Sequence, residues 1–424
     1  MKKTLLLGLG MVASLLLLAL IIAWPREEFI ASSSPAAYAG TPANIARGAY
    51  LARAGDCMAC HTVRGGVPYA GGRAIDTPFG RLLAPNITSD RERGIGAWSA
   101  DDFWNALHNG KSRNGRLLYP AFPYTSYTRV NRDDADALYA YLRSIPADKT
   151  ASQPHELGFP YNQQSMLAGW RLLYFKPAVF APINTQSVQW NRGAYLVDGL
   201  GHCVACHSER NRLGASAGRL SGGMLKTLGW YAPSLTSDAE AGLGSWEVPH
   251  IVELLQTGIA PRATVFGPMA EVVQQSLQHL STDDVTAMAV YLKALPEDKI
   301  APVEMARGPQ VDQVMAQGKE LYKTHCMECH GADGKGLPPH YPPLDGNRAI
   351  TMAESVNPIR IVLNGGFAPG TRGNPRPYGM PPFSHVLNDH EAAAVVSYLR
   401  GSWSNQAPPV TATQVNRYRR VPLD

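Results

Sequence analysis

Cys57-Met58-Ala59-Cys60-His61 is the stretch of sequence that decides the fold, because the same pattern returns twice further along the chain. The later copies are Cys203-Val204-Ala205-Cys206-His207 and Cys326-Met327-Glu328-Cys329-His330. Together the three copies use all six cysteines of the 424 residues, so none remains for a structural disulfide. Cys-x-x-Cys-His is typical of covalently attached c-type haem. The two thiols can bond the haem vinyl groups and hold the adjacent histidine against the iron.

The three motifs therefore predict three haem c groups. The residues expected to form thioethers are Cys57, Cys60, Cys203, Cys206, Cys326 and Cys329. The expected proximal iron ligands are His61, His207 and His330. A zinc site would need a second Cys or His pair at matching spacing, and a thioredoxin-like redox pair would need a strand–helix–strand setting. Neither pattern is apparent, which favours haem.

The sequence around the motifs is repeated as well. Pro85-Asn86-Ile87-Thr88-Ser89-Asp90 of the first unit returns as Pro233-Ser234-Leu235-Thr236-Ser237-Asp238 in the second. Each unit also ends in a segment with apolar residues at helical spacing and aspartate near its start, which suits a helix N-terminus. These predicted closing helices are Asp133–Ile145, Asp283–Leu295 and Asp389–Arg400.

We therefore expect a mainly α fold, with three tandem class I cytochrome c-like domains behind an N-terminal transmembrane helix. The expected divisions are an anchor and linker at 1–40, domains at 41–150, 188–300 and 314–402, linkers at 151–187 and 301–313, and a polar tail at 403–424. The three domains are called the first, second and third unit below.

The sixth iron ligand is expected to differ among the units. Met269 and Met380 stand between the motif and the closing helix of the second and third units, and a methionine thioether raises the potential of haem iron. In the first unit Phe122 occupies the matching position and cannot bind iron. Either His108 is the distal ligand there or the first haem is five-coordinate, and both alternatives predict a lower potential. His108 could equally be an ordinary polar residue of its helix.

The N-terminus predicts export. Lys2 and Lys3 precede an apolar run of 20 residues, Leu5–Trp24. A helix of this length, rising about 1.5 Å per residue, would cross a hydrocarbon core of about 30 Å, whereas the apolar part of a signal peptide is roughly 7–15 residues. A small-residue site at Ala37-Tyr38-Ala39 leaves cleavage open, although a retained anchor is favoured. The lysines place the body on the periplasmic side of a bacterial inner membrane.

Charge and motif content limit the possible functions. The net charge of +5 is spread along the chain without a Lys/Arg run, so we expect no nucleic-acid partner. The sequence shows no dinucleotide fingerprint on a βαβ unit and no Ser/His/Asp set in a recognisable order. Oxidation of an organic substrate by this chain itself is therefore not expected.

Further stretches complete an ordered set of motifs: Asn86-Ile87-Thr88, Gly94-Ile95-Gly96 and Leu118-Tyr119-Pro120-Ala121. With this set, over roughly residues 44–402, the chain resembles the triple-haem cytochrome subunits of bacterial membrane-bound gluconate, alcohol, aldehyde, sorbitol and fructose dehydrogenases. The resemblance implies a separate flavin-, quinone- or molybdenum-dependent subunit that oxidises the substrate. It also implies electron transfer onward to ubiquinone or a terminal oxidase. The family's Tyr-Pro-Ala-Met-Pro loop has Phe122 in place of methionine here.

The function expected from these features is that of a non-catalytic, electron-carrying subunit of an oxidoreductase complex in the membrane. The alternative is a haem peroxidase-like enzyme, in which a five-coordinate first iron binds peroxide and His108 acts as the distal acid or base. The substrate of the complex is not encoded in these motifs, because substrate contacts would lie on the partner subunit.

Overall fold

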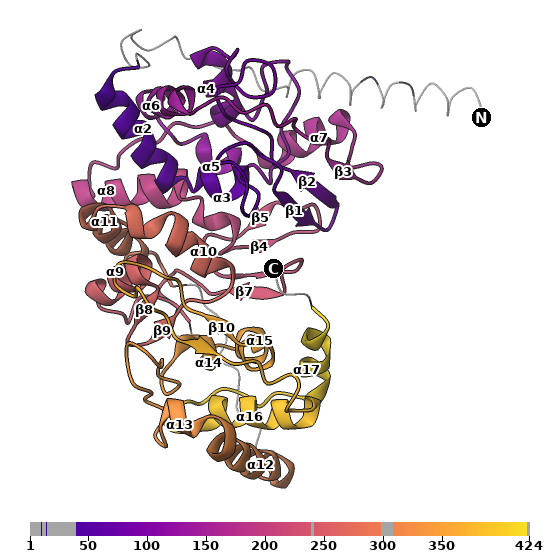
Figure 1. Cartoon of the computed structure of the whole chain (residues 1–424), viewed down its shortest axis with the longest axis vertical. Coiled ribbons are helices and arrows are strands. Elements are labelled where there is room, and N and C mark those ends of the chain that lie inside the picture. The colour runs from indigo at the N-terminus through magenta and orange to yellow at the C-terminus, as the bar shows by residue number, and fades with distance from the viewer. Residues whose placement is uncertain (1–9, 11–13, 15–39, 239–240, 298–307, 422–424) are drawn as a thin grey trace.

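The computed structural model describes residues 10, 14, 40–238, 241–297 and 308–421 (Figure 1). The expected anchor at Leu5–Trp24 lies outside these residues apart from the two isolated ones, and so does part of the expected linker at 301–313. Among the helices that the structure describes, none is both long enough and apolar enough to cross a bilayer.

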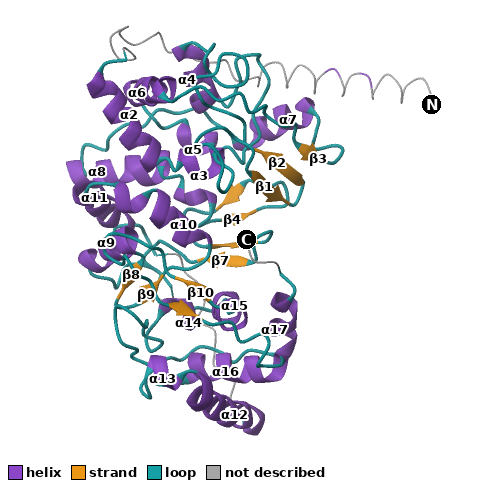
Figure 2. Ribbon diagram, in the orientation of Figure 1, coloured by secondary structure: helices purple, strands orange, loops and turns teal. Residues whose placement is uncertain are grey.

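The chain folds as helices joined by long loops, and its strands contain only two to four residues (Figure 2). The prediction of a mainly α fold is thus confirmed. The elements of the first unit and the following linker are α2 (Pro42–Ala54), α3 (Cys57–His61), β1 (Ala74–Thr77), β2 (Gly80–Leu83), α4 (Ala100–Asn109), α5 (Tyr124–Tyr127), α6 (Arg132–Ser144), β3 (Glu156–Leu157) and α7 (Gln164–Tyr174). The antiparallel sheet of the first unit has the strand order β1-β2-β3, so the linker supplies its third strand.

The second unit contains α8 (Val188–Tyr195), the π-helical turn η1 (Leu196–Leu200), the 3₁₀ turn η2 (Cys203–Ala205), β4 (Glu209–Arg210), β5 (Ser216–Ala217), β6 (Gly223–Leu225), β7 (Trp230–Ala232), α9 (Val248–Thr257), β8 (Ile259–Ala260), β9 (Ala263–Thr264), α10 (Pro268–Gln275), η3 (Leu277–His279) and α11 (Thr282–Lys293). The third unit and the residues on either side of it contain α12 (Pro309–His325), α13 (Met327–His330), α14 (Arg348–Thr351), α15 (Val356–Asn364), β10 (Gly366–Phe367), β11 (Gly379–Met380), α16 (Asp389–Gly401) and α17 (Ala412–Arg419).

The predicted closing helices are confirmed as α6, α11 and α16, to within two residues at each end. Each begins at a side-chain cap: Asn131, Ser281 and Asn388 accept a hydrogen bond from a backbone N–H of the first turn. Such caps satisfy donors that a helix start leaves without intrahelical partners. The caps and the acidic residues of the first turn explain why these helices begin where they do.

A glycine contact joins the first helix of each unit to the closing helix. The contact occurs three times: Gly48 with Ala137, Gly193 with Ala287, and Gly318 with Ala394. At each glycine an added Cβ would overlap the carbonyl oxygen of the paired alanine and crowd the tyrosine one turn further along. The missing side chain therefore lets the two helix backbones approach closely at the crossing. This repeated crossing places the three Cys-x-x-Cys-His motifs in equivalent positions, just after each first helix.

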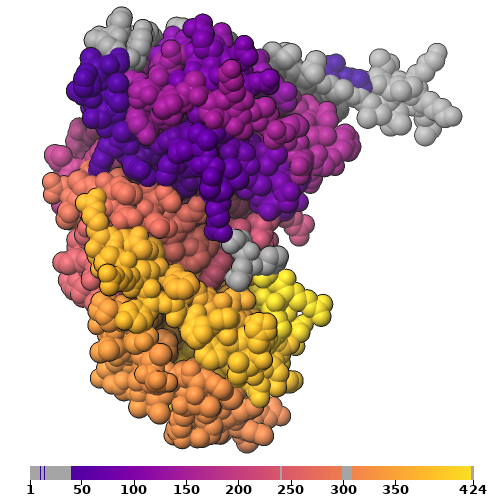
Figure 3. Space-filling model, in the orientation of Figure 1, coloured from indigo at the N-terminus to yellow at the C-terminus, as the bar shows by residue number. Residues whose placement is uncertain are grey.

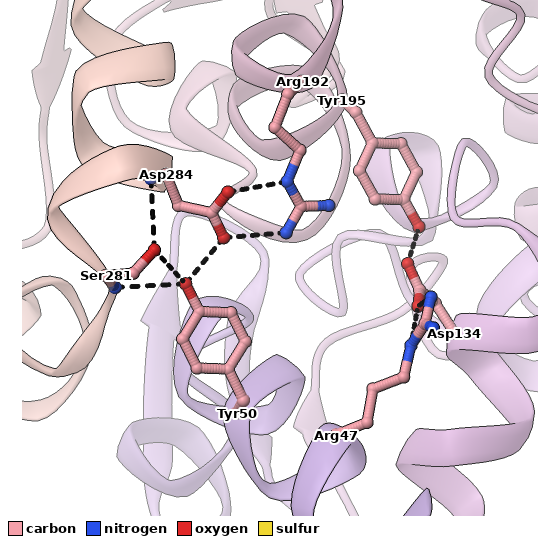
Figure 4. Close-up of polar contacts among 7 residues, drawn as sticks. All are labelled: Arg47, Tyr50, Asp134, Arg192, Tyr195, Ser281 and Asp284. Atoms are coloured by element: carbon pink, nitrogen blue, oxygen red, sulfur yellow. Dashed lines mark hydrogen bonds and ion pairs between the residues drawn. The ribbon is translucent and has the colours of Figure 1, made fainter. Parts of the chain in front are cut away.

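The first and second units contact each other reciprocally (Figure 4). Tyr195 of the second unit donates a hydrogen bond to Asp134 of the first, with 2.5 Å between the oxygens. Tyr50 of the first unit donates to Asp284 of the second, at 2.6 Å. Each carboxylate also binds an arginine of its own unit: Arg47 with Asp134, and Arg192 with Asp284. Equivalent residues thus exchange equivalent bonds across the interface.

The apolar core is divided into two clusters rather than three. One continuous cluster of buried residues extends through the first and second units, from Leu51 to Leu295. A separate cluster, which includes Tyr322 and Val395, lies within the third unit. The first two units therefore stabilise each other through shared apolar burial, whereas the third has a core of its own.

The second unit lies between the other two along the long axis of the molecule (Figures 1 and 3). The third unit is joined to it by hydrogen bonds between Asn357 and the backbone of Tyr231, and by one from the Thr371 hydroxyl to the Thr257 carbonyl. The segment at 403–424, expected to be a polar tail, includes α17, which packs on α15 and α16. Val415 of α17 is fully buried, and Arg419 binds Asp389 at 2.6 Å.

Candidate haem-binding sites

The first and third motifs form short helical turns, α3 and α13, and the second forms the 3₁₀ turn η2. The two cysteines of each pair differ in the same way in all three motifs. The first cysteine is half-buried and the second is exposed, and none of the six is in a disulfide. Two thiols on one turn, with one facing the interior, suit attachment to the edge of a haem held within the unit.

The proximal histidines are oriented by backbone carbonyls, which the sequence analysis did not predict. His61 Nδ1 lies 2.7 Å from the Pro85 oxygen, His207 Nδ1 lies 2.6 Å from that of Pro233, and His330 Nδ1 lies 3.1 Å from that of Pro342. Nδ1–H donation to a carbonyl leaves Nε2 as the nitrogen that can bind a metal. All three motifs therefore present an iron ligand in the same tautomer.

The protonation of these histidines also fits metal binding. Burial lowers the pKa of His61, His207 and His330, and that of His207 falls to about 4. A neutral imidazole at neutral pH is the form that binds a metal. Paired thiols beside an oriented, neutral imidazole are the residues that covalent haem requires, so the three motifs fit that cofactor.

The predicted distal methionines lie in different local structures. Met269 is in the first turn of α10, two residues after Gly267, and a Cβ added at Gly267 would collide with Trp230. Met380 is in β11, beside Gly365, where an added Cβ would overlap the Met380 carbonyl oxygen. Each methionine is partly buried, and each packs on the same cluster as the first cysteine of its unit. Their ligation of iron stays a prediction, with positions that are consistent with it.

Phe122 takes the matching place in the first unit. It is partly buried against the cluster that Cys57 also contacts, and its ring centroid lies 5.3 Å from that of Tyr127. His108, the tentative alternative, is buried on α4, stacks on Trp104 at 4.6 Å and has Nδ1 3.4 Å from the Thr128 hydroxyl. These contacts give His108 partners within its own helix and the following segment, and its role at the iron stays a prediction.

The first and second motifs lie next to each other across the interface of their units. Tyr127 donates a hydrogen bond to the Gly55 carbonyl at 3.1 Å, and its ring centroid lies 5.6 Å from that of His202. Gly55 and His202 come just before the first cysteine of their motifs. The two attachment sites are therefore close neighbours.

Asp56 is a further residue at this place that the sequence analysis missed. It directly precedes Cys57, and one of its carboxyl oxygens is buried without a hydrogen-bond partner. Burial, and secondarily the Glu271 carboxylate of the second unit, raises the pKa of Asp56 to about 8. Glu271 in turn binds Arg73 of the first unit, whose guanidinium also donates to the Ala59 carbonyl at 2.6 Å. Charged residues of both units thus meet beside the first motif.

The sequence matches known cytochromes over most of its length. The family model for cytochrome c matches residues 45–146 and 315–403. The gluconate 2-dehydrogenase cytochrome c subunit of Pantoea cypripedii is 39% identical over 395 residues, which make up 89% of this chain and 89% of that protein. The alcohol dehydrogenase (quinone) cytochrome c subunit of Gluconobacter oxydans is 36% identical over 397 residues, or 88% of this chain and 82% of that protein.

A third relative is much longer. A nicotinate dehydrogenase subunit of Pseudomonas putida is 40% identical over 404 residues, which are 93% of this chain and 33% of that protein. This chain therefore spans about a third of the length of that relative. The repeated motifs, the oriented histidines and these similarities agree. The chain belongs to the family of haem c-binding cytochrome c subunits of dehydrogenases.

Proposed function

We propose that the chain is the electron-transfer subunit of a dehydrogenase complex on the periplasmic side of a bacterial inner membrane. It binds three haem c groups in three cytochrome c domains and oxidises no organic substrate itself. A catalytic subunit, dependent on flavin, quinone or molybdenum, supplies the electrons, and ubiquinone or a terminal oxidase receives them. Similarity to the cytochrome c subunits of gluconate and alcohol dehydrogenases supports the complex, and the run Leu5–Trp24 supports the membrane location.

The observation that supports a relay most directly is the linear arrangement of the three units, with the second in the middle (Figure 1). Bound haem supplies a one-electron iron couple. The protein positions that couple through the oriented His61, His207 and His330. Contacts of Tyr127 with Gly55 and His202 bring the first two attachment sites together. Electrons that enter at one end would therefore pass through the second unit to leave at the other.

The function is tested with the complete complex, purified through a tag on this chain. Mass spectrometry of the covalently modified peptides should find haem on all three motifs, and a co-purified dehydrogenase subunit should be identified. Adding the substrate of that subunit should reduce the haems and then a ubiquinone analogue. A complex in which the quinone is reduced equally fast without this chain would contradict the proposal.

The membrane location needs its own experiment. A chain in which residues 1–24 are replaced by a cleavable export signal should still acquire haem but be recovered in the periplasmic fraction. The unchanged chain should be recovered with the membrane and resist extraction by salt. Release of the unchanged chain by salt alone would contradict an apolar anchor.

Replacing Phe122 by methionine is expected to raise the potential of the first haem by about 0.1 V or more, because a thioether ligand favours ferrous iron and axial ligands span a range of about 0.8 V. A redox titration followed by absorbance would show the shift, together with the spectrum of a newly methionine-ligated ferric haem. Phe122→Leu is the matched control, since leucine has the bulk without the sulfur. An equal shift in both variants would show that packing, rather than ligation, had changed.

A further inference from the structure

Arg348 belongs to the third unit, but its charged end lies in the second. It is the first residue of α14, and its backbone N–H donates to the Arg262 carbonyl of the second unit at 3.1 Å. Its Nη2 donates to the Ser234 carbonyl, also of the second unit, at 2.5 Å. Only 6% of the residue is exposed to solvent. The third unit therefore places a buried guanidinium inside its neighbour.

Within the part of the chain that the structure describes, this guanidinium forms no ion pair. Its Nε has no hydrogen-bond partner, and among the described residues no carboxylate lies within ion-pair distance of Arg348. A second cation is close instead, because the Arg262 and Arg348 guanidinium groups each lie 5.6 Å from the ring of buried Trp246. Burial lowers the pKa of Arg348 to about 10; the Asp238 carboxylate opposes this shift, and the Arg262 charge adds to it to a smaller extent. A buried charge of this kind normally requires a partner of opposite sign.

Arg348 lies next to the second motif, and this position indicates which anionic group would be its partner. Ser234 directly follows Pro233, whose carbonyl accepts the hydrogen bond from His207 Nδ1 at 2.6 Å. The Arg348 charge is near enough to contribute to the lowered pKa of His207. The anionic part of a haem is its pair of propionates, and a guanidinium binds a carboxylate with two parallel hydrogen bonds.

The first unit has no equivalent of this arrangement among the contacts that the structure describes. Asn86 matches Ser234 in the repeat, and its side chain donates to the carbonyls of Asp148 and Thr150 at 2.8 and 2.9 Å. At the place that corresponds to Arg348, the first unit therefore has its own C-terminal residues, and the groups that they offer to Asn86 are uncharged backbone carbonyls. Of these two units, only the second has a described cation bound to the residue that follows the histidine-orienting proline.

We propose that Arg348 binds a propionate of the second haem, so that the third unit completes the cofactor site of the second. The inference rests on the proposed haem at Cys203 and Cys206. The positive charge stabilises the iron after it gains an electron, because reduction makes the haem more negative. Docking of the third unit therefore raises the potential of the second haem.

The test compares variants of the full-length chain. Arg348→Gln removes the charge, and Arg348→Lys keeps it. Arg417→Gln is the matched control, since it removes a positive charge from an exposed position of α17, which packs on the third unit. Potentials are measured by spectroelectrochemical titration. The second haem is identified by comparison with a Cys203→Ser/Cys206→Ser chain that lacks it. Haem on each motif is counted by mass spectrometry, and circular dichroism monitors folding.

We expect Arg348→Gln to keep three haems and to shift the reduction equilibrium of the second haem about tenfold towards the ferric form, or about 59 mV for one electron. Arg348→Lys should recover most of this shift, and Arg417→Gln should cause none. If a folded Arg348→Gln chain with three haems has unchanged potentials, the inference about Arg348 is wrong, while the proposed function is unaffected. Loss of stability in both Arg348 variants without movement of the second potential would assign Arg348 a structural role and overturn it too. Absence of haem from Cys203 and Cys206 in the unchanged chain would instead overturn the proposed function.

Discussion

Replacing both Cys203 and Cys206 by serine is expected to leave the chain with two haems and to reduce substrate-dependent quinone reduction by the complex to background. The second unit lies between the first and third, so its cofactor is the only one placed to connect them in the proposed relay (Figure 1). Both thioethers would be lost, and a haem held by His207 alone would not be covalently retained. Rapid-mixing absorbance of the purified complex measures the defect. One end haem should still be reduced by substrate, while the other stays oxidised.

A matched control keeps both thiols of the same motif. Val204→Ala changes the residue between them and should retain three haems and near-normal quinone reduction. If the serine variant has two haems but reduces quinone at the rate of the unchanged complex, electrons do not pass through the second unit and the linear relay is wrong.

Replacing Gly193 by leucine is expected to destabilise the first two units together. The new side chain would collide with the backbone of Ala287 and the Cβ of Tyr291, so α8 and α11 would have to separate. Overpacking of this kind lowers the free energy of unfolding by about 1–3 kcal/mol, and by more where the backbone must move. At roughly 2–4 °C per kcal/mol, the melting temperature should fall by several degrees. Thermal unfolding of the full chain, followed by circular dichroism, measures the loss.

Two comparisons sharpen this prediction. Gly169 is also in a helix, α7, but an added Cβ there would meet no atom within 4 Å, so Gly169→Leu should not lower the melting temperature. Gly318→Leu should affect the third unit alone, because its apolar cluster is separate from the one shared by the others. If Gly193→Leu and Gly169→Leu lower the melting temperature equally, the close crossing of α8 and α11 does not contribute to the stability of the chain.

Local features were predictable from the sequence because their causes are local. The closing helices combine apolar spacing with acidic residues and a cap within a few positions, so α6 (Arg132–Ser144) was located almost to the residue. The helix α17 (Ala412–Arg419) has a similar local signal in its sequence. Thr411 and Gln414 form a capping box, with each side chain bound to the other's backbone, and Val415 follows them.

Features that depend on packing between units were not predictable in this way. The carbonyls of Pro85, Pro233 and Pro342 orient the histidines, but a backbone oxygen has no side-chain signature in a sequence. The sequence around Arg348 does not indicate its role, because its contact with the second unit forms only when α14 packs there. The shared core arises for the same reason, since apolar spacing predicts which face of a helix is buried but not which unit covers it.

The reciprocal bonds of Tyr50 and Tyr195 have a consequence for the direction of electron flow. They give the first two units the self-complementary contacts of a two-fold symmetric dimer, in which a residue and its equivalent exchange the same bond. A symmetric pair of identical haem domains has no preferred direction. The third unit breaks that symmetry, because it docks on the second unit and inserts Arg348 there, whereas the first unit has Phe122 at its distal position. The chain therefore has polarity, with two chemically different ends for a donor and an acceptor.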